Sequence, residues 1–127
     1  MGTIKRFEDM QVWRKARVFV NEIYRLTSNG LFSKDFSLRD QIRRVSVSIV
    51  LNTAEGFARK SDKEFSQFLV QAHGSTAEVQ SALYIAFDQK YLSDDEFDKL
   101  YNMGSEISSM LMSLSKYLHL KSKNKKS

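Results

Sequence analysis

Apolar residues recur at alternating intervals of four and three residues along four separate stretches of this 127-residue chain. Steps of three and four residues return to the same side of an α-helix, so each stretch predicts an amphipathic helix of two to three heptads. The chain contains no proline, and nothing in it therefore forces a break inside these helices. Four such helices joined by short connections predict an all-α fold, an antiparallel up-down four-helix bundle.

Residues typical of helix ends separate the four stretches. In a capping box, the side chains of a Ser and of a Glu three residues later satisfy free amides at the start of a helix. The signals are Asn29-Gly30 for a helix end, and Ser37 with Asp40, Ser61 with Glu64 and Ser93 with Glu96 for helix starts. They predict helices near residues 9–29, 37–60, 62–90 and 94–120, in one bundle domain over residues 1–120, with a basic disordered tail over residues 121–127.

A second apolar stripe runs beside the first on three of the helices. Part of it is ordinary core, because a helix in a bundle buries about three positions in seven. On the second helix it consists of Val47, Leu51, Ala54 and Ala58. The surplus on the first and fourth helices predicts a subunit interface, because large apolar patches are seldom left in water. The residues assigned to this interface are Trp13, Val20, Tyr24, Met103, Met110 and Tyr117.

Charge is distributed unevenly along the chain. Residues 1–60 carry a net charge of +6, residues 61–120 carry −5 and residues 121–127 carry +4, which leaves the whole chain at +5. Opposite charges on two halves of a bundle favour head-to-tail association of identical subunits, and such heterologous contacts can close into rings. The same asymmetry also suits an orientation of the basic half toward a polyanion.

Polar side chains lie next to the apolar stripes of the second and third helices. An unpaired polar group costs about 1–3 kcal/mol when it is buried, so buried groups must hydrogen-bond to one another. We predict a polar network that fixes the register of the two helices, and the alternative is contact with a ligand or partner. The expected neighbours are Ser48 with Ser75 or Gly74, Asn52 with Gln71 and Arg44 with Glu78, with Glu55 beside them. The small residues around Gly74 predict a close approach of the facing helix.

Exposed basic residues are the candidates for an outward function. Arrays of Lys and Arg bind phosphate backbones through counterion release and need no contact with the bases. The alternative is a solvated basic surface that serves solubility and assembly. The candidates for nucleic-acid binding are Arg14, Arg17, Arg25, Arg39, Arg43, Lys121, Lys123, Lys125 and Lys126, whereas Arg44 and Arg59 are also candidates to pair with Glu78 and Glu64.

Catalytic and metal-binding patterns are missing from the sequence. The chain has no cysteine, and neither of its histidines, His73 and His119, completes the Glu-x-x-His pattern of di-iron bundles. No phosphate-binding loop or metalloprotease motif is present. We therefore expect a protein that is not an enzyme and that holds no cofactor and no metal. The absence of an apolar leader or of a membrane-spanning run predicts a cytoplasmic location with no membrane partner.

Several strings stand on consecutive predicted helices in a distinctive order. They are Phe7-Glu8-Asp9-Met10-Gln11-Val12-Trp13, Gln41-Ile42-Arg43-Arg44, Asn52-Thr53-Ala54-Glu55-Gly56, and Ala72-His73-Gly74-Ser75 followed by Glu78. Their order and spacing resemble the 23S rRNA intervening sequence proteins, also labelled S23 ribosomal proteins, over about residues 7–118. Many relatives have proline and serine where this chain has Val50 and Leu51, which suggests a straighter second helix here.

This resemblance implies a bacterial helical bundle that forms a homopentamer and binds nucleic acid. It also implies a relation to the accessory variability protein of diversity-generating retroelements, a basic pentameric barrel that binds nucleic acid and a reverse transcriptase. Taken with the residues, it predicts a non-catalytic protein that binds RNA or DNA through phosphate contacts as a ring-shaped homo-oligomer. The alternative is an oligomeric scaffold whose main partner is a protein.

Overall fold

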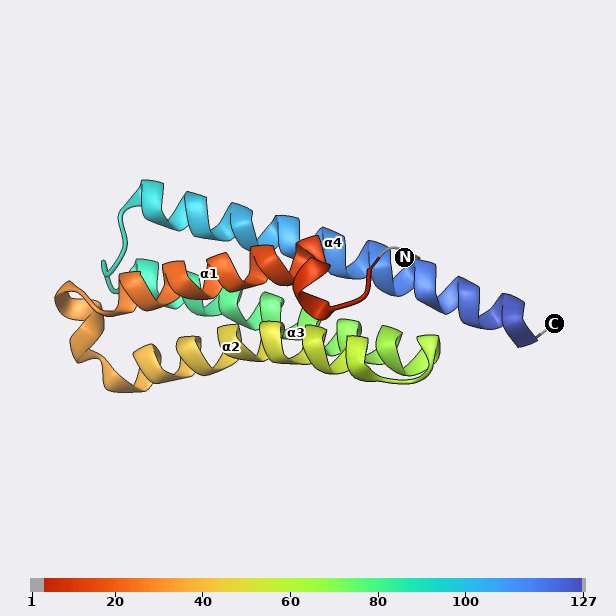
Figure 1. The fold of residues 1–127 in the computed structure, drawn as a ribbon. Helices are drawn as coiled ribbons and strands as arrows, with labels where there is room; N and C mark the ends of the chain where they lie inside the picture. The colour runs from red at the N-terminus through yellow and green to blue at the C-terminus, as the bar shows by residue number, and fades with distance from the viewer. Residues whose placement is uncertain (1–3, 127) are drawn as a thin grey trace.

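The computed structural model describes residues 4–126 and contains four long helices in antiparallel order (Figure 1). These are α1 (Gln11–Thr27), α2 (Phe36–Ala58), α3 (Asp62–Asp88) and α4 (Asp94–Lys126). Two short 3-10 helices, η1 (Phe7–Asp9) and η2 (Gly30–Lys34), precede and follow α1. Within residues 4–126 the structure has no strand, and the prediction of an all-α four-helix bundle is confirmed.

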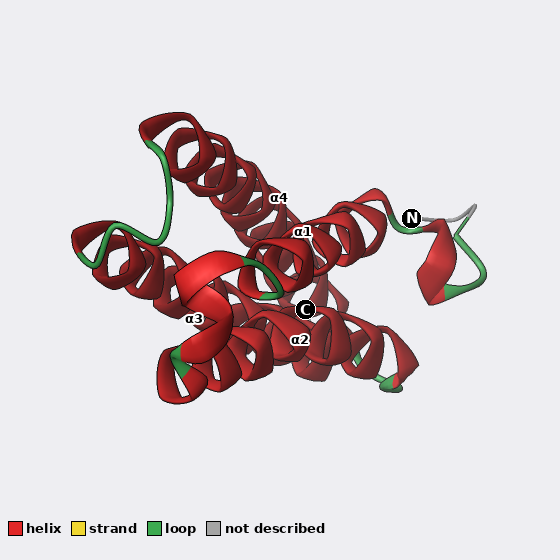
Figure 2. Ribbon diagram, turned by 90° about the vertical axis from the view of Figure 1, so that its left-hand side faces the viewer, coloured by secondary structure: helices red, strands yellow, loops and turns green. Residues whose placement is uncertain are grey.

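The core follows the four predicted stripes. Phe19 and Ile23 of α1, Leu69 of α3 and Leu111 of α4 are fully buried, as is Ile49 of α2. α1 packs between α2 and α4, and α3 packs between the same two helices on the other side (Figure 2). Each helix therefore packs its apolar stripe against two neighbouring helices and exposes its remaining side chains to solvent.

Two of the predicted capping boxes begin helices in the structure. The Oγ atom of Ser61 accepts a hydrogen bond of 3.1 Å from the amide of Glu64, and Oγ of Ser93 accepts one of 3.1 Å from the amide of Glu96. The Glu96 carboxylate returns the bond, since Oε1 accepts 2.8 Å from the amide of Ser93. These bonds fix where α3 and α4 start.

The start of α2 differs from the expected one at Ser37. Asp35 is the capping residue, and its Oδ1 atom accepts a hydrogen bond of 3.1 Å from the amide of Leu38. The preceding Gly30 has a φ of +60°, a left-handed conformation that glycine adopts without strain. The chain therefore reverses direction between α1 and α2 through a short 3-10 helix, η2, before Asp35 caps the next helix.

α4 is longer than expected. In place of the predicted disordered tail, the structure has helix from residue 121 to Lys126. Residues 121–126 contain no glycine or proline, and lysines near a helix C-terminus are favoured by the helix dipole. An ion pair of 3.8 Å between Nζ of Lys121 and Oδ2 of Asp62 ties this part of α4 to the start of α3.

Candidate nucleic-acid interface

The three predicted arginines of α1 are exposed, but they differ in their partners. Arg25 forms two hydrogen bonds of 2.9 Å with the carboxylate of Glu22, so a phosphate would have to compete with that carboxylate. Arg14 donates to the carbonyl oxygen of Asp9 at 3.1 Å, and the Arg17 guanidinium lies 5.7 Å from the ring centre of Trp13. Among residues 4–126, neither Arg14 nor Arg17 forms an ion pair with a carboxylate, so no carboxylate competes with a phosphate for them.

The predicted arginines of α2 hold parts of the fold together. Nε of Arg43 donates to Oγ1 of Thr27 at 2.7 Å, and Nη2 donates to Oγ of Ser28 at 3.0 Å. Both acceptors belong to the end of α1, so Arg43 joins α1 to α2. Arg39 contacts Oδ1 of Asp40 at 2.9 Å and the carbonyl oxygen of Ser33 at 3.1 Å.

The predicted lysines of α4 fall into two groups. Lys121 is half-buried and pairs with Asp62, whereas Lys123 is exposed. The side chains of Lys125 and Lys126 lie outside the part of the chain that the structure describes. Only Lys123 of this set is thus shown as an exposed cation.

The two expected arginine–glutamate pairs have different outcomes. Nη1 of Arg59 lies 3.7 Å from Oε2 of Glu64, as expected, and its Nη2 also binds Oε1 of Glu55 at 2.9 Å. Arg44 instead donates to the amide oxygen of Gln41 at 3.1 Å. Arg44 is therefore held along α2 itself rather than across to Glu78 on α3.

The polar network between α2 and α3 is smaller than predicted. Ser48 donates to Ser75 across the two helices at 2.7 Å, which is one of the expected pairs. Gln71 and Glu78 are exposed, and within residues 4–126 no hydrogen bond joins Asn52 to Gln71. These side chains point away from the seam, so they need no buried partner. Gly74 likewise faces open space, and the close approach expected there is absent from the described chain.

A buried serine pair between α3 and α4 was missed from the sequence. The hydroxyl groups of Ser66 and Ser115 lie 2.8 Å apart, and Ser66 also bonds to the carbonyl oxygen of Ser115 at 3.0 Å. Each serine stands directly beside a core position, Phe65 or Leu114, but nothing in the sequence pairs residues 49 positions apart. The pair locks the register of the two longest helices.

The residues predicted for the subunit interface separate into two groups. Trp13, Met103 and Met110 are partly buried and pack against the core, and Val20 is half-buried. Tyr24 and Tyr117 are 41% and 47% exposed. Only these two tyrosines therefore leave a large part of their side chains free for another molecule.

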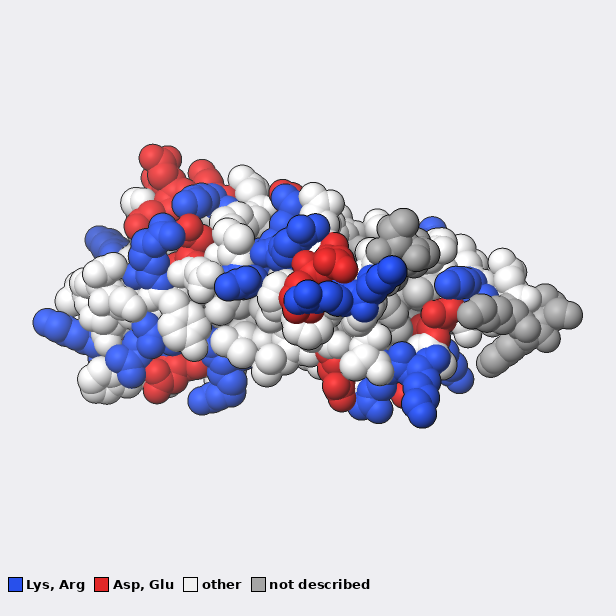
Figure 3. Space-filling view, in the orientation of Figure 1, with Lys and Arg blue, Asp and Glu red and all other residues white. Residues whose placement is uncertain are grey.

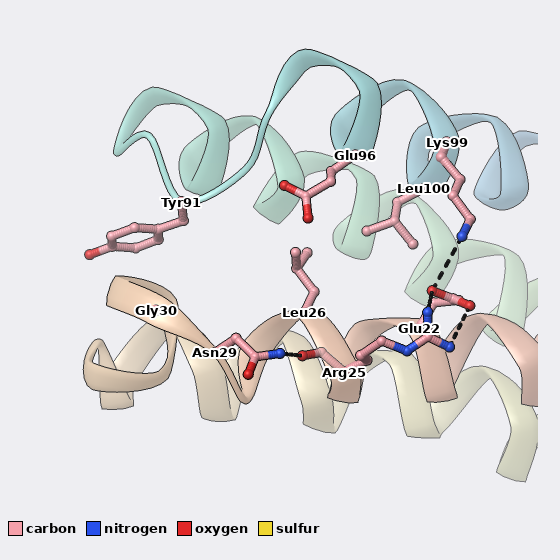
Figure 4. A pocket seen from close by; sticks show the side chains of 9 residues that line it. All are labelled: Glu22, Arg25, Leu26, Asn29, Gly30, Tyr91, Glu96, Lys99 and Leu100. Atoms are coloured by element: carbon pink, nitrogen blue, oxygen red, sulfur yellow. Dashed lines mark hydrogen bonds and ion pairs between the residues drawn. The ribbon is translucent and has the colours of Figure 1, made fainter.

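A cleft of about 320 Å³ opens between the end of α1 and the start of α4 (Figure 4). At one end, Nζ of Lys99 lies 3.5 Å from Oε2 of Glu22. Lys99 and Arg25 therefore share the carboxylate of Glu22. Leu26 and Leu100 point into the space between the two helices. The arrangement stabilises the α1–α4 seam and sets no nucleophile beside a base.

Tyr91 links the α3–α4 connection to the start of α2. Its hydroxyl donates to Oδ2 of Asp35 at 2.9 Å, and its ring stacks on Phe32 with 5.1 Å between the ring centres. The hydrogen bond to Asp35 raises the pKa of Tyr91 above its usual 10.0, and burial and the Asp35 charge add smaller effects in the same direction. The neutral hydroxyl is therefore the form that the folded state prefers.

Replacing Tyr91 by Phe is expected to lower Tm at about pH 7, because it removes a hydrogen bond to a carboxylate. A folded-state pKa that is raised gives stability that is fully present below the unfolded pKa and lost as the pH rises through the folded one. The difference between wild type and Tyr91→Phe should therefore shrink as the pH rises above about 10. Thermal unfolding of both proteins across this range measures it, and a difference that stays constant contradicts the assignment.

Neither a metal-ligating group of three side chains nor a helix able to span a bilayer occurs among residues 4–126. His73 is half-buried on α3 and His119 is exposed on α4. The described surface offers a set of exposed cations, and two of them, Arg14 and Arg17, lie one turn apart on α1. Guanidinium groups of this kind bind phosphate oxygens through paired N–H donors.

Comparisons with known proteins agree with this fold. The crystal structure of a protein of unknown function from the S23 ribosomal protein family of Bacteroides thetaiotaomicron superposes with a TM-score of 0.76. It shares 26% sequence identity, and the match covers 83% of this chain and 98% of that one. No curated protein matches, and the predicted relation to the accessory variability protein stays a prediction. The model of the 23S rRNA-intervening sequence protein family matches residues 8–113, and the chain therefore belongs to that family.

Proposed function

We propose that this protein binds RNA or DNA through phosphate contacts, without catalysis, as a ring-shaped homo-oligomer. The observation that carries the proposal is the pair of exposed arginines Arg14 and Arg17, which lie one turn apart on α1. No carboxylate among residues 4–126 pairs with them, so binding a phosphate does not first require an ion pair to be broken. The net charge of +5 supports the same interpretation.

A ring strengthens this binding mode. Each phosphate contact that one subunit makes is weak by itself. Several copies of the α1 arginine pair on one assembly raise the overall affinity, because later contacts form at a high effective concentration.

Replacement of Arg14 and Arg17 by Gln tests the phosphate contacts. Binding to duplex DNA should weaken steeply with salt, and the double variant should lower the log–log slope by about 0.9 for each phosphate that it leaves without an arginine. Fluorescence anisotropy across a salt series measures this slope. Arg25→Gln is the matched control, because Glu22 already binds Arg25.

Binding must be present in the wild type before the slopes are compared. The assays use structured RNA, single strands and duplex DNA at about 50 mM salt, where phosphate contacts are strongest. If none of these binds, the proposal fails and the scaffold function takes its place.

One observation favours that second function. Leu51 is 63% exposed on α2 and lines a shallow, mostly apolar groove with Phe7, Ala54 and Ala58, whose polar members are Asn52 and Glu55. Apolar grooves of this kind suit a protein partner better than a phosphate backbone. In a scaffold, Leu51→Asp would abolish partner binding and leave nucleic-acid binding unchanged.

A further inference from the structure

An exposed aromatic cluster lies on the outer side of α3 and α4, near the loop that joins them. Tyr84 is 52% exposed, and its ring centre lies 4.9 Å from that of Phe97 and 5.8 Å from that of Tyr101. Phe97 and Tyr101 stack on each other at 5.6 Å. Within residues 4–126, no hydrogen bond engages either tyrosine hydroxyl, so the cluster has polar edges available to another molecule.

Two exposed carboxylates accompany this cluster. Asp88 follows Tyr84 by one turn on α3, and Asp98 precedes Tyr101 by one turn on α4. Among the described residues, neither Asp88 nor Asp98 forms an ion pair, whereas seven of the other thirteen carboxylates do. Asp88 is the last residue of α3, where the helix dipole disfavours negative charge. The stability of α3 therefore does not explain a carboxylate at this position. We call Tyr84, Asp88, Phe97, Asp98 and Tyr101 the acidic–aromatic surface.

A surface of opposite charge lies on α1 and α2. The Arg43 guanidinium sits 4.6 Å from the ring centre of Tyr24, and that of Arg39 sits 4.8 Å from the ring centre of Phe36. Phe36 is 64% exposed, and Lys34 stands two residues before it. We call Tyr24, Lys34, Phe36, Arg39 and Arg43 the basic–aromatic surface.

The two surfaces occupy the same end of the bundle but opposite sides of it. The bond between Tyr91 and Asp35 joins the α3–α4 loop to the start of α2, so both surfaces lie at that end. One belongs to the α1–α2 pair and the other to the α3–α4 pair. In Figure 3, acidic atoms gather over the start of α4 at the upper left, and basic atoms lie over the start of α2 at the lower left.

We propose that the basic–aromatic surface of one copy binds the acidic–aromatic surface of the next copy. The contact sets Lys34, which forms no ion pair among the described residues, and Arg39, which already binds Asp40, against Asp88 and Asp98. It also removes half-exposed rings on both sides from water. Because the two surfaces differ, the contact is heterologous and each copy keeps one of each kind free for another neighbour. Both surfaces lie at one level of the bundle, so neighbouring copies stand side by side, as a closed ring requires.

This inference rests on the ring in the proposed function and names the surfaces that form it. It also divides the arginines between two tasks. Arg39 and Arg43 lie in the contact between copies, whereas Arg14 and Arg17 stay outside it and face the nucleic acid.

Two charge-reversed proteins test the contact. The first carries D88K and D98K, and the second carries K34E and R39E. Each reverses one surface and leaves the other intact, so each alone should be a monomer of about the chain mass of 14.7 kDa by light scattering. An equimolar mixture should form particles heavier than a monomer, because an intact acidic surface then meets an intact basic one and the reversed surfaces attract each other. The two proteins must alternate, so the full wild-type mass returns only for a ring with an even number of copies. The matched control carries D9K and E78K, which makes the same charge change outside both surfaces.

The mixing step also shows that the variants are folded, since unfolded chains cannot restore each other's assembly. A D88K/D98K protein that keeps the wild-type mass overturns the contact while the ring itself stands through other surfaces. A wild type that is monomeric overturns the ring and the contact together. A control variant that also falls to a monomer overturns the contact, because net charge would then be the cause.

Discussion

Phe19→Ala is expected to lower the free energy of unfolding by about 3–5 kcal/mol, the largest effect of any single change considered. Phe19 is completely buried in the middle of α1, between α2 and α4. Removing the ring loses its transfer free energy and leaves a cavity that helices on both sides cannot fill by moving. Since domains of this size have about 5–15 kcal/mol in total, much of the stability is lost.

Urea unfolding followed by far-UV circular dichroism measures this loss. Val18→Ala is the matched control, because Val18 is the preceding residue of the same helix and is 52% exposed. Its effect should stay within about 0.5 kcal/mol. Both are compared at one protein concentration, because assembly adds to the apparent stability. Equal losses for the two variants would contradict the burial pattern.

Gly56→Ala is expected to lower the free energy of unfolding by about 1–2 kcal/mol, although alanine favours helix by about 1 kcal/mol over glycine. A Cβ atom at Gly56 would lie 2.9 Å from Cδ1 of Phe65 and 2.9 Å from Cβ of Phe68. It would also lie 3.2 Å from the carbonyl oxygen of Phe65. This oxygen belongs to the backbone of α3 and cannot rotate away as a side-chain atom can. Relieving this overlap would push α2 and α3 apart next to the turn that joins them.

Gly74→Ala provides the contrast. Nothing lies within 4 Å of a Cβ atom at Gly74, so only the helix preference acts and stability should rise by about 0.5–1 kcal/mol. Chemical denaturation of the two variants gives the comparison. Two changes of the same sign would show that packing against α3 does not set the role of Gly56.

The heptad spacing predicted the bundle well because burial of apolar side chains depends mostly on position along a helix. It also placed Ser48 level with Ser75, since one turn length fixes the register of two neighbouring helices. The same arithmetic failed for Asn52 and Gln71, because register along the helices does not specify rotation about them. Gln71 lies on the outer side of α3 and needs no partner.

The basic candidates were harder to assign for a different reason. An arginine on the exposed side of a predicted helix gives the same sequence pattern whether it binds a phosphate or a neighbouring helix. Arg43 binds Thr27 and Ser28 at the end of α1, a contact decided by how the two helices pack. Arg25 was recognisable, since Glu22 stands three residues before it on the same side of the helix.

Because α1 is much shorter than α4, one end of the bundle has fewer packed helices than the other. α1 has 17 residues and α4 has 33, so the last third of α4 lacks α1 as a neighbour. Tyr117 and Leu120 remain 47% and 51% exposed for this reason. Backbone amides there are protected only by the helix itself and by α3, so they open to solvent without unfolding the rest. We therefore expect hydrogen exchange to reach the final turns of α4 before it reaches the part of the bundle that α1 covers.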